Sequence, residues 1–386
     1  MASYAPSLIN FRFQLLTEIR AAGHEVLCLA PDLDRETIDT LDAAGLQSDS
    51  IKLERTGLNP MADVETVRAL IARFRAWSPD VVTGYTPKAA IYSALAGHQA
   101  GVSRRVPMIT GLGYAFLKSW NPKIMAVRQA TKLLYRRAFR ASTGLIFQNK
   151  DDLATLQSLR LIPRSMPIAL VGGSGVDVDR FAASPLPPVD NGLTFLLIAR
   201  LVRYKGIFEF CEAARIVRSR GHKARFVLIG PSEGGPAGLP ASELARYSDV
   251  VTYLGSKDDV RPFIRDAHVY VLPSYGEGMP RTVLEALAMG RPIITTDANG
   301  CRDTVEPGSN GLIVPVADAR ALADAMMRLI AEPDRLAAMA TASRLKAERE
   351  FDVKIVNRAT RTALGLGLGS DGEDLPIGPG PTLERL

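Results

Sequence analysis

The sequence is poor in cysteine and histidine, and both shortages exclude classes of protein. Its three cysteines, Cys28, Cys211 and Cys301, are odd in number and far apart, which argues against a disulfide framework. The four histidines are equally scattered and show no ligand spacing with one another or with a cysteine. No metal site is therefore predicted.

Long apolar runs are also missing. No uninterrupted apolar stretch approaches the ~18 residues that would favour a transmembrane helix. The N-terminus lacks the basic, apolar and small-residue order of an export signal, so a cytoplasmic protein is expected. The chain has 386 residues, of which 47% are apolar and 23% charged, and it is long enough for two domains with full cores.

Negative charge is absent from one long segment. Val81–Lys150 contains eleven Lys and Arg residues and no Asp or Glu. Four of these cations recur every four residues, as one stripe of a helix would: Arg128, Lys132, Arg136 and Arg140. An apolar face adjoins the stripe, which favours a surface that lies on anionic lipid headgroups. The alternative is a solvated face of a core helix. Nucleic-acid binding is not predicted, because no recognised module accompanies the charge.

Apolar strands alternate with amphipathic segments along the chain, which is typical of α/β folds with parallel sheets. The first half has such strands at 25–30, 81–84, 108–110 and 145–148. The second half has them at 193–198, 225–229, 250–253, 269–272, 292–295 and 312–314. A proline-rich connector at 184–191 separates the halves. We therefore predict an N-terminal domain over 1–185 and a C-terminal domain over 191–350. A glycine- and proline-rich tail at 365–386 is predicted to be disordered.

The most informative stretch is Tyr275–Glu285, which indicates a strand end, a glycine turn and a helix start. Pro280 suits the first helical position, and Gly276 and Gly278 allow backbone to approach a ligand closely. A helix start carries unpaired N–H groups and a partial charge of roughly +0.5, which favour a phosphate.

Two carboxylates, Glu277 and Glu285, flank this predicted phosphate-binding position in the sequence. Retaining glycoside hydrolases hold two carboxyl groups ~5–5.5 Å apart, whereas these glutamates would lie roughly 12 Å apart along a helix. They cannot flank one glycosidic bond, but they could hold two ends of a nucleotide-sugar whose diphosphate lies between them. The simpler alternative is a helix cap plus a solvated glutamate.

Glu277-x7-Glu285, with Leu272-Pro273-Ser274 before it and residues 290–297 after it, resembles the E-x7-E signature of family 4 retaining glycosyltransferases. Glu277–Arg281 and Thr110–Phe116 further resemble bacterial enzymes that add a hexose or N-acetylhexosamine to undecaprenyl-diphosphate-linked sugars. The resemblance implies a GT-B fold, with two Rossmann-like domains whose parallel sheets face a cleft. It also implies a metal-independent reaction with a UDP-sugar as donor, at the inner face of the plasma membrane.

The same resemblance implies roles for particular residues. Arg200 and Lys205 match the pair that contacts the donor diphosphate, Glu277 the residue that binds the donor sugar, and Glu285 the one that holds the ribose. The remaining donor-side residues are Gly278, Met279 and Thr282, and the acceptor-side residues are Asn10, Lys88, Gly111 and Gly113. Asn10 is expected in a loop. Residues 351–364 are expected to cross back to the N-terminal domain.

Two further expectations come from departures from the family pattern. The family has a hydrophobic strand before the segment that starts at Met1, and here it is absent, so the N-terminal sheet is expected to lack its first strand. A histidine common at the strand end before Gly111 is replaced by Thr110-Gly111-Leu112-Gly113. Two alternatives to a transferase remain: a nucleotide-sugar hydrolysing epimerase of the same fold, and a non-catalytic carbohydrate- or membrane-binding protein.

Overall fold

The chain folds into two units, each with its own parallel strands and apolar cores. The structure, a computed structural model, describes residues 1–54, 59–112, 116, 122–232 and 238–367. Unit 1 is Met1–Ser174 together with Val356–Leu386, and unit 2 is Gly175–Ile355. Of the tail predicted to be disordered, 368–386 lies outside the described residues.

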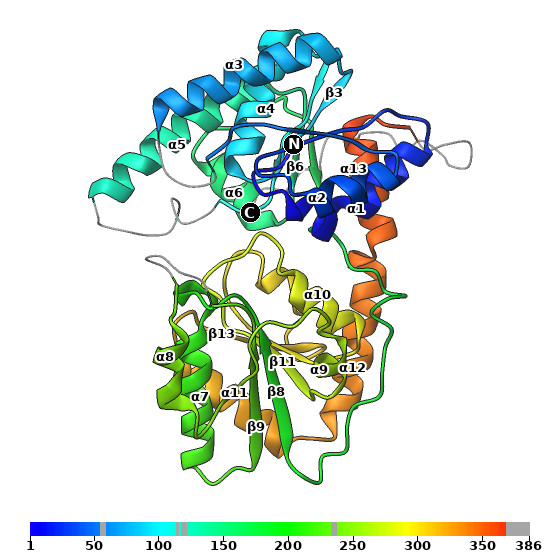
Figure 1. The fold of residues 1–386 in the computed structure, drawn as a ribbon. Coiled ribbons are helices and arrows are strands. Elements are labelled where there is room, and N and C mark those ends of the chain that lie inside the picture. The colour runs from blue at the N-terminus through cyan, green and yellow to red at the C-terminus, as the bar shows by residue number, and fades with distance from the viewer. Residues whose placement is uncertain (55–58, 113–115, 117–121, 233–237, 368–386) are drawn as a thin grey trace. The chain divides into compact units, whose positions relative to one another are not determined.

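Unit 1 alternates helices with short parallel strands (Figure 1). Its helices are α1 Pro6–Ala21, α2 Arg35–Ala43, α3 Pro60–Trp77, α4 Pro87–Ala100, α5 Pro122–Ala141 and α6 Lys150–Ser158. Its strands are β1 Leu27–Ala30, β2 Gln47–Ser50, β3 Val81–Val82, β4 Arg104–Arg105, β5 Met108–Ile109, β6 Leu145–Phe147 and β7 Ile168–Leu170. They pair as β1-β2, β3-β4 and β5-β6-β7.

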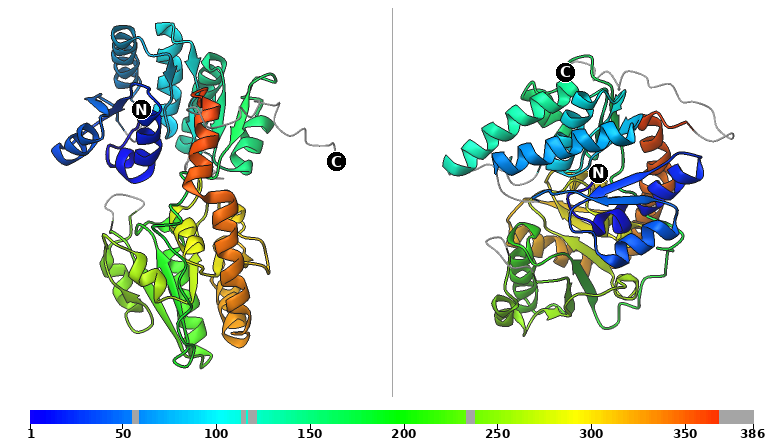
Figure 2. Two further views of the ribbon diagram at one scale, coloured as in Figure 1. Left: turned by 90° about the vertical axis from the view of Figure 1, so that its right-hand side faces the viewer. Right: turned by 45° about the horizontal axis from the view of Figure 1, so that its top comes forward.

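Two apolar cores lie on the two sides of these strands. Helix α4 packs against both α3 and α5 (Figure 2), and their core takes in Leu29 and Val82. The second core joins α1 and α2 to helix α13, Val353–Leu364, which starts in unit 2 and ends in unit 1. It takes in Cys28 and Ala30. Neighbouring residues of β1 thus enter different cores, because successive side chains of a strand point to opposite faces.

Unit 2 is built on one six-stranded parallel sheet in the order β10-β9-β8-β11-β12-β13. Its strands are β8 Leu193–Ile198, β9 Ala224–Ile229, β10 Thr252–Tyr253, β11 Val269–Leu272, β12 Ile293–Thr296 and β13 Gly311–Val314. Its helices are α7 Ile207–Ser219, α8 Ala241–Leu244, α9 Arg261–Arg265, α10 Arg281–Ala288, α11 Ala319–Ala331 and α12 Arg335–Lys346.

Both faces of this sheet are covered, which explains the continuous apolar strands in the sequence. Phe195 and Leu197 of β8 enter the core with α7 and α11, whereas Leu196 and Ile198 enter the core with α9 and α10. Figure 1 shows α7 and α11 together on one side of the strands, and α9 and α10 on the other.

The proline-rich connector at 184–191 lies inside unit 2, because the division of the chain falls at Ser174/Gly175. Arg291, which is fully buried, holds the start of the connector. Its guanidinium donates to the carbonyls of Ser184, Pro185 and Ala267. Burial lowers the pKa of Arg291 to about 10. Composition alone could not reveal this anchor, because its partners are carbonyl groups of the backbone.

Candidate functional site

The order of strands in unit 2 defines where a ligand is expected. From β8 the chain adds β9 and β10 on one side and then β11, β12 and β13 on the other. This is the doubly wound order 3-2-1-4-5-6, in which ligands bind at the carboxyl ends of the strands where the direction reverses. In unit 2 that switch point lies between β8 and β11, which end at Ile198 and Leu272.

A close backbone contact brings the segments after these two strands together. Residues Arg203–Lys205 form a 3₁₀ turn after β8, and Gly206 follows it with φ +71°. A Cβ at Gly206 would lie 2.0 Å from the carbonyl oxygen of Pro273, so only glycine fits here. The Tyr275 N–H also donates to the Tyr204 carbonyl at 2.8 Å. The turn that carries Lys205 is therefore fixed against the end of β11.

This contact places Lys205 beside Glu277. The Lys205 Nζ lies 2.5 Å from the Glu277 Oε1, and the two side chains are only 16% and 13% exposed. The Glu277 N–H donates to the Asn299 carbonyl at 2.9 Å, and a Cβ at Gly300 would lie 2.5 Å from the Glu277 carbonyl oxygen. The loop after β12 thus holds the glycine turn from the other side.

Glu285 lies one helix further on and has a different cation. It is 7% exposed in α10, and its Oε1 accepts from the Arg281 Nε at 3.0 Å. Burial raises the pKa of Glu285, and the positive charge of Arg281 opposes that rise. Each glutamate therefore forms an ion pair with a cation of its own. The alternative prediction that Glu285 is a solvated glutamate is wrong, because its carboxylate is buried.

The first turn of α10 lies between these two ion pairs. Pro280 is the residue just before the helix, and Val283 and Leu284 donate their N–H groups to its carbonyl. The first turn of a helix precedes the first intrahelical bonds, so this is where its N–H groups can donate to an anion. The Thr282 hydroxyl itself donates to the Ile198 carbonyl at 3.2 Å, which fixes the helix start to the end of β8.

The remaining residues predicted for the donor side lie close to this turn in the chain or at the end of β8. Gly278 and Met279 are half-buried, and Met279 packs on the core beneath α10. Arg200 follows β8 and donates to the Tyr204 hydroxyl at 3.0 Å. Sequence reasoning missed Arg281 and Tyr204 as neighbours of the site. The i,i+4 spacing of Arg281 and Glu285 on a helix was a signal for the first, whereas no local pattern indicates the second.

The residues predicted for the acceptor side that the structure describes all fall in unit 1. Asn10 lies in helix α1, so its predicted loop position is wrong; Pro6 starts that helix. Lys88 lies in the first turn of α4, and its Nζ forms an ion pair with Asp63 of α3 at 2.8 Å. Gly111 follows β5 with φ +126°, and Gly113 lies outside the described residues.

The predicted basic stripe lies on α5, and its members differ in exposure. Arg136 and Arg140 are exposed, as is Arg137 beside them, whereas Arg128 and Lys132 are half-buried. Arg128 lies over the Phe116 ring, 6.0 Å from its centroid. The same exposed surface carries Met125 and Leu133, each 47% exposed.

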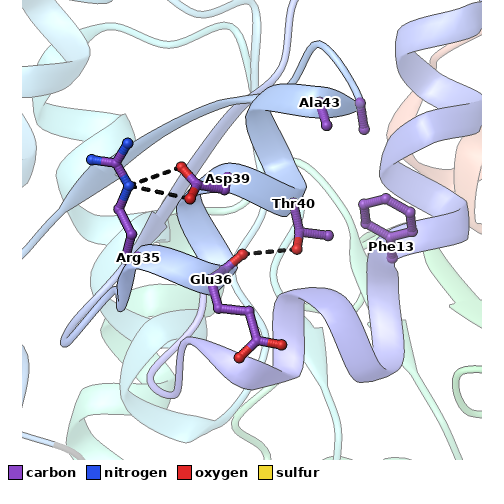
Figure 3. Close-up of a pocket in the computed structure, with 7 residues that line it drawn as sticks. Phe13, Arg35, Glu36, Asp39, Thr40 and Ala43 are labelled. Atoms are coloured by element: carbon purple, nitrogen blue, oxygen red, sulfur yellow. Dashed lines mark hydrogen bonds and ion pairs between the residues drawn. The ribbon is translucent and has the colours of Figure 1, made fainter.

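Two cavities of unit 1 have none of the predicted site residues in their linings. One, of about 860 Å³, is a surface hollow between α1 and α2 (Figure 3). Of its three charged side chains, Arg35, Glu36 and Asp39, the first and last pair with each other at 3.0 Å. The other, of about 440 Å³, lies among the strands of unit 1.

Among the described residues, no group of three or more His, Cys, Asp or Glu side chains could hold a metal ion. Within the same residues, no helix is long and apolar enough to cross a membrane.

Family profiles match both units. The profile "Glycosyl transferase 4-like domain" matches residues 12–172, and "Glycosyl transferases group 1" matches residues 192–332. A relative from Campylobacter jejuni, N,N'-diacetylbacillosaminyl-diphospho-undecaprenol alpha-1,3-N-acetylgalactosaminyltransferase, is 26% identical over 86% of this chain and 88% of its own. An Escherichia coli UDP-Gal:alpha-D-GlcNAc-diphosphoundecaprenol alpha-1,3-galactosyltransferase is 25% identical over 69% of this chain and 70% of its own.

Solved structures agree on the fold. Anabaena Alr3699/HepE in complex with UDP superposes with a TM-score of 0.72 at 16% identity, covering 94% of this chain and 98% of that one. The fold and the two profiles therefore define a glycosyltransferase with the GT-B architecture, as the sequence predicts. The two profiles identify its family: the chain belongs to the group 1, or family 4, retaining glycosyltransferases.

Proposed function

We propose that this glycosyltransferase moves a hexose or N-acetylhexosamine from a UDP-sugar to a sugar carried on a polyprenyl diphosphate. The donor side of this proposal rests on the groups that lie at the switch point of unit 2. There the Lys205 ammonium, the Arg200 guanidinium and the first-turn N–H groups of α10 gather at the ends of β8 and β11. The solved relative that superposes on this chain holds UDP.

The charges of the site suit a departing diphosphate. As the bond between the sugar and the diphosphate breaks, negative charge grows on the phosphate oxygens, and fixed cations stabilise it without a metal. A lysine has three N–H donors, so Lys205 can keep its bond to Glu277 while it donates to phosphate. Glu277 is held at the glycine turn by the Asn299 carbonyl, where it can accept from donor-sugar hydroxyls. We assign Glu285, with Arg281, to the ribose.

Retention of configuration fits a front-face transfer. The acceptor oxygen forms its bond to the sugar carbon on the face from which the diphosphate leaves, and the acceptor proton passes to a departing phosphate oxygen. The enzyme orients the reactants and stabilises charge. We assign the donor to unit 2 and the acceptor to unit 1, with Asn10 and Gly111 as acceptor-side residues. Lys88 is a weaker candidate, because Asp63 already neutralises its charge.

The names of the relatives support the acceptor class. The Campylobacter jejuni and Escherichia coli relatives are both named for sugars on undecaprenyl diphosphate. The exposed face of α5, with Arg136, Arg137 and Arg140 beside Met125 and Leu133, has the composition of a helix that lies in a membrane interface. We therefore place the enzyme at the inner face of the plasma membrane, in bacterial polysaccharide synthesis.

A transfer assay tests the reaction. The purified chain is incubated with labelled UDP-sugars and undecaprenyl-diphosphate-linked sugar, with and without EDTA. Label in the lipid fraction in both arms is the expected result. Free UDP with an epimerised sugar would indicate the hydrolysing epimerase, and no turnover the non-catalytic protein. Lys205→Ala should abolish most transfer, whereas Arg203→Ala in the same turn should not, since Arg203 is mostly exposed and faces Glu243.

A binding assay tests the membrane surface. Reversing Arg136 and Arg140 to Glu should weaken binding to anionic vesicles by at least about 30-fold, because each basic residue near such a surface contributes about 1 kcal/mol. The matched control reverses Arg68 and Arg75, which are exposed on α3. Equal losses in both variants, or none in the first, would contradict the assignment of α5.

A further inference from the structure

The loop between β8 and α7 contains a tyrosine, Tyr204, that lies between the two predicted cations Arg200 and Lys205 in the sequence. The Arg200 Nη2 donates to the Tyr204 hydroxyl at 3.0 Å. The Lys205 Nζ instead lies 2.5 Å from the Glu277 Oε1. One cation of the site is therefore bonded to a neutral hydroxyl group and the other to a carboxylate.

Hydrogen bonds to its backbone fix the position of Tyr204. Its carbonyl accepts from the Tyr275 N–H at 2.8 Å and from the Ser274 hydroxyl at 3.1 Å. On the other side of the pair, Leu201 is fully buried next to Arg200 in the chain. The backbone at both ends of the bond between Arg200 and Tyr204 is thus held against the core of unit 2, so the hydroxyl has a defined position before any ligand binds.

Tyr275, which holds the Tyr204 carbonyl, is itself bonded to helix α7. Its hydroxyl donates to the Glu209 Oε1 at 2.6 Å. Burial, together with this bond, raises the pKa of Tyr275 to about 12, so its hydroxyl stays protonated and remains a donor at neutral pH. A continuous path of hydrogen bonds therefore leads from α7 through the two tyrosines to the Arg200 guanidinium.

A neutral partner suits an arginine that binds an anion. A free arginine side chain loses much rotamer freedom when it binds, and a hydroxyl that already holds the guanidinium reduces that loss. Because the hydroxyl is neutral, it does so without cancelling the positive charge that attracts phosphate, as a carboxylate would. A guanidinium has five N–H donors, so Arg200 can donate to phosphate while it keeps its bond to Tyr204.

We propose that Tyr204 is a positioning residue of the donor site, whose hydroxyl holds the Arg200 guanidinium in the direction from which it contacts the donor diphosphate. This inference rests on the proposed function, in which Arg200 binds that diphosphate. Tyr204 acts through Arg200 and is assigned no contact of its own with the substrate. Its effect should therefore vanish once the guanidinium is removed.

The effect of Tyr204 should be larger on kcat than on the KM for the UDP-sugar. Negative charge grows on the diphosphate as its bond to the sugar breaks, so a correctly directed guanidinium contributes more in the transition state than in the bound donor. Tyr204→Phe keeps the ring and removes the oxygen that accepts from Arg200. We expect it to lower kcat about tenfold and to raise the KM by less than about threefold.

UDP binding provides a measurement that needs no acceptor. The terminal phosphate of UDP carries the charge that develops in the reaction, so Tyr204→Phe should weaken UDP binding about tenfold. Calorimetric titration of the full chain compares the unaltered protein, Tyr204→Phe, Arg200→Met and the double variant. In the Arg200→Met background, Tyr204→Phe should change the UDP affinity by less than about twofold, because no guanidinium remains to be positioned.

Tyr247→Phe is the matched control. The Tyr247 hydroxyl donates to the Glu212 Oε1 at 2.6 Å, also in unit 2, and its bond involves none of the predicted site residues. This variant loses a tyrosine hydroxyl and a hydrogen bond as Tyr204→Phe does, so a general loosening of unit 2 would appear in both. Tyr247→Phe should keep both kcat and the UDP affinity.

The outcomes separate this inference from the function on which it rests. If Tyr204→Phe keeps the UDP affinity and kcat within about twofold, or weakens UDP binding as strongly in the Arg200→Met background as in the unaltered chain, the hydroxyl does not act through Arg200 and the proposal is overturned. If Arg200→Met and Lys205→Ala both bind UDP as the unaltered chain does, the donor assignments fail as well.

Discussion

The ion pair between Lys205 and Glu277 gives the sharpest test of the site. Glu277→Gln keeps the shape of the side chain and removes its charge, which leaves the Lys205 ammonium without its partner at 2.5 Å. Both side chains are less than one-fifth exposed. Loss of one partner costs about 3–5 kcal/mol in a fully buried pair and about 0–1 kcal/mol at the surface. We therefore expect about 2 kcal/mol of lost stability, or roughly 4–8 °C in melting temperature.

The effect on activity should be larger and should not follow stability. Removing one preorganised group that stabilises charge in the transition state costs about 10²–10³ in kcat. In the double variant Lys205→Met/Glu277→Gln no unpaired charge remains, so part of the lost stability should return. The transfer rate should stay as low as in the worse single variant, because both groups act on the same step.

The assay combines thermal unfolding with single-turnover transfer to the lipid-linked acceptor, for the two single variants, the double variant and Arg203→Ala as control. If Glu277→Gln keeps kcat within threefold of the unaltered enzyme, the pair is structural and the assigned roles are wrong. Recovery of activity together with stability in the double variant would lead to the same conclusion.

Three further predictions concern backbone and pH. Gly206→Ala should destabilise unit 2 by more than about 2 kcal/mol, because its Cβ would meet the Pro273 carbonyl. Gly221→Ala is the control: Gly221 also has a positive φ but has open space around it, so this variant should cost only about 1 kcal/mol. Equal losses of stability in thermal unfolding of the two variants would refute the close contact. Burial raises the pKa of Glu285 above 4.5, so the unfolding free energy falls as pH rises past that value. Glu285→Gln should remove this fall. If the difference in unfolding free energy between this variant and the unaltered chain is the same at every pH, the prediction is wrong. The lowered pKa of the Met1 amino group makes the unfolding free energy rise as pH increases toward 8.0, and acetylated protein should lack that rise in melts across this range.

The strands of unit 2 could be predicted almost residue by residue. Leu193–Ile198 and Val269–Leu272 are found with the predicted bounds, because strands covered on both faces appear as unbroken apolar runs. The polar strand β2, Gln47–Ser50, and the two-residue β4, Arg104–Arg105, escaped prediction. Their side chains are exposed or half-buried, so they carry no apolar signal.

The structure brings the predicted residues Lys205 and Glu277 together, but the sequence could not predict that they pair. Glu277 and the helix after it are visible as a local pattern, and so is the turn that carries Lys205. The bond between these two residues joins positions 72 apart in the chain, and it depends on the contact of Gly206 with Pro273, which no local pattern shows. Asn10 was misplaced because the apolar residues of α1 are spread around the helix and not gathered on one face, so that Pro6 alone marks the helix start.

The position of a bound diphosphate tests the central claim most directly. A crystal structure with UDP should show both phosphates at the first turn of α10, within hydrogen-bond distance of the Lys205 Nζ and near the Arg200 guanidinium, with the ribose toward Glu285. Nucleotide bound away from the carboxyl ends of β8 and β11, or no binding at millimolar UDP, would contradict the account.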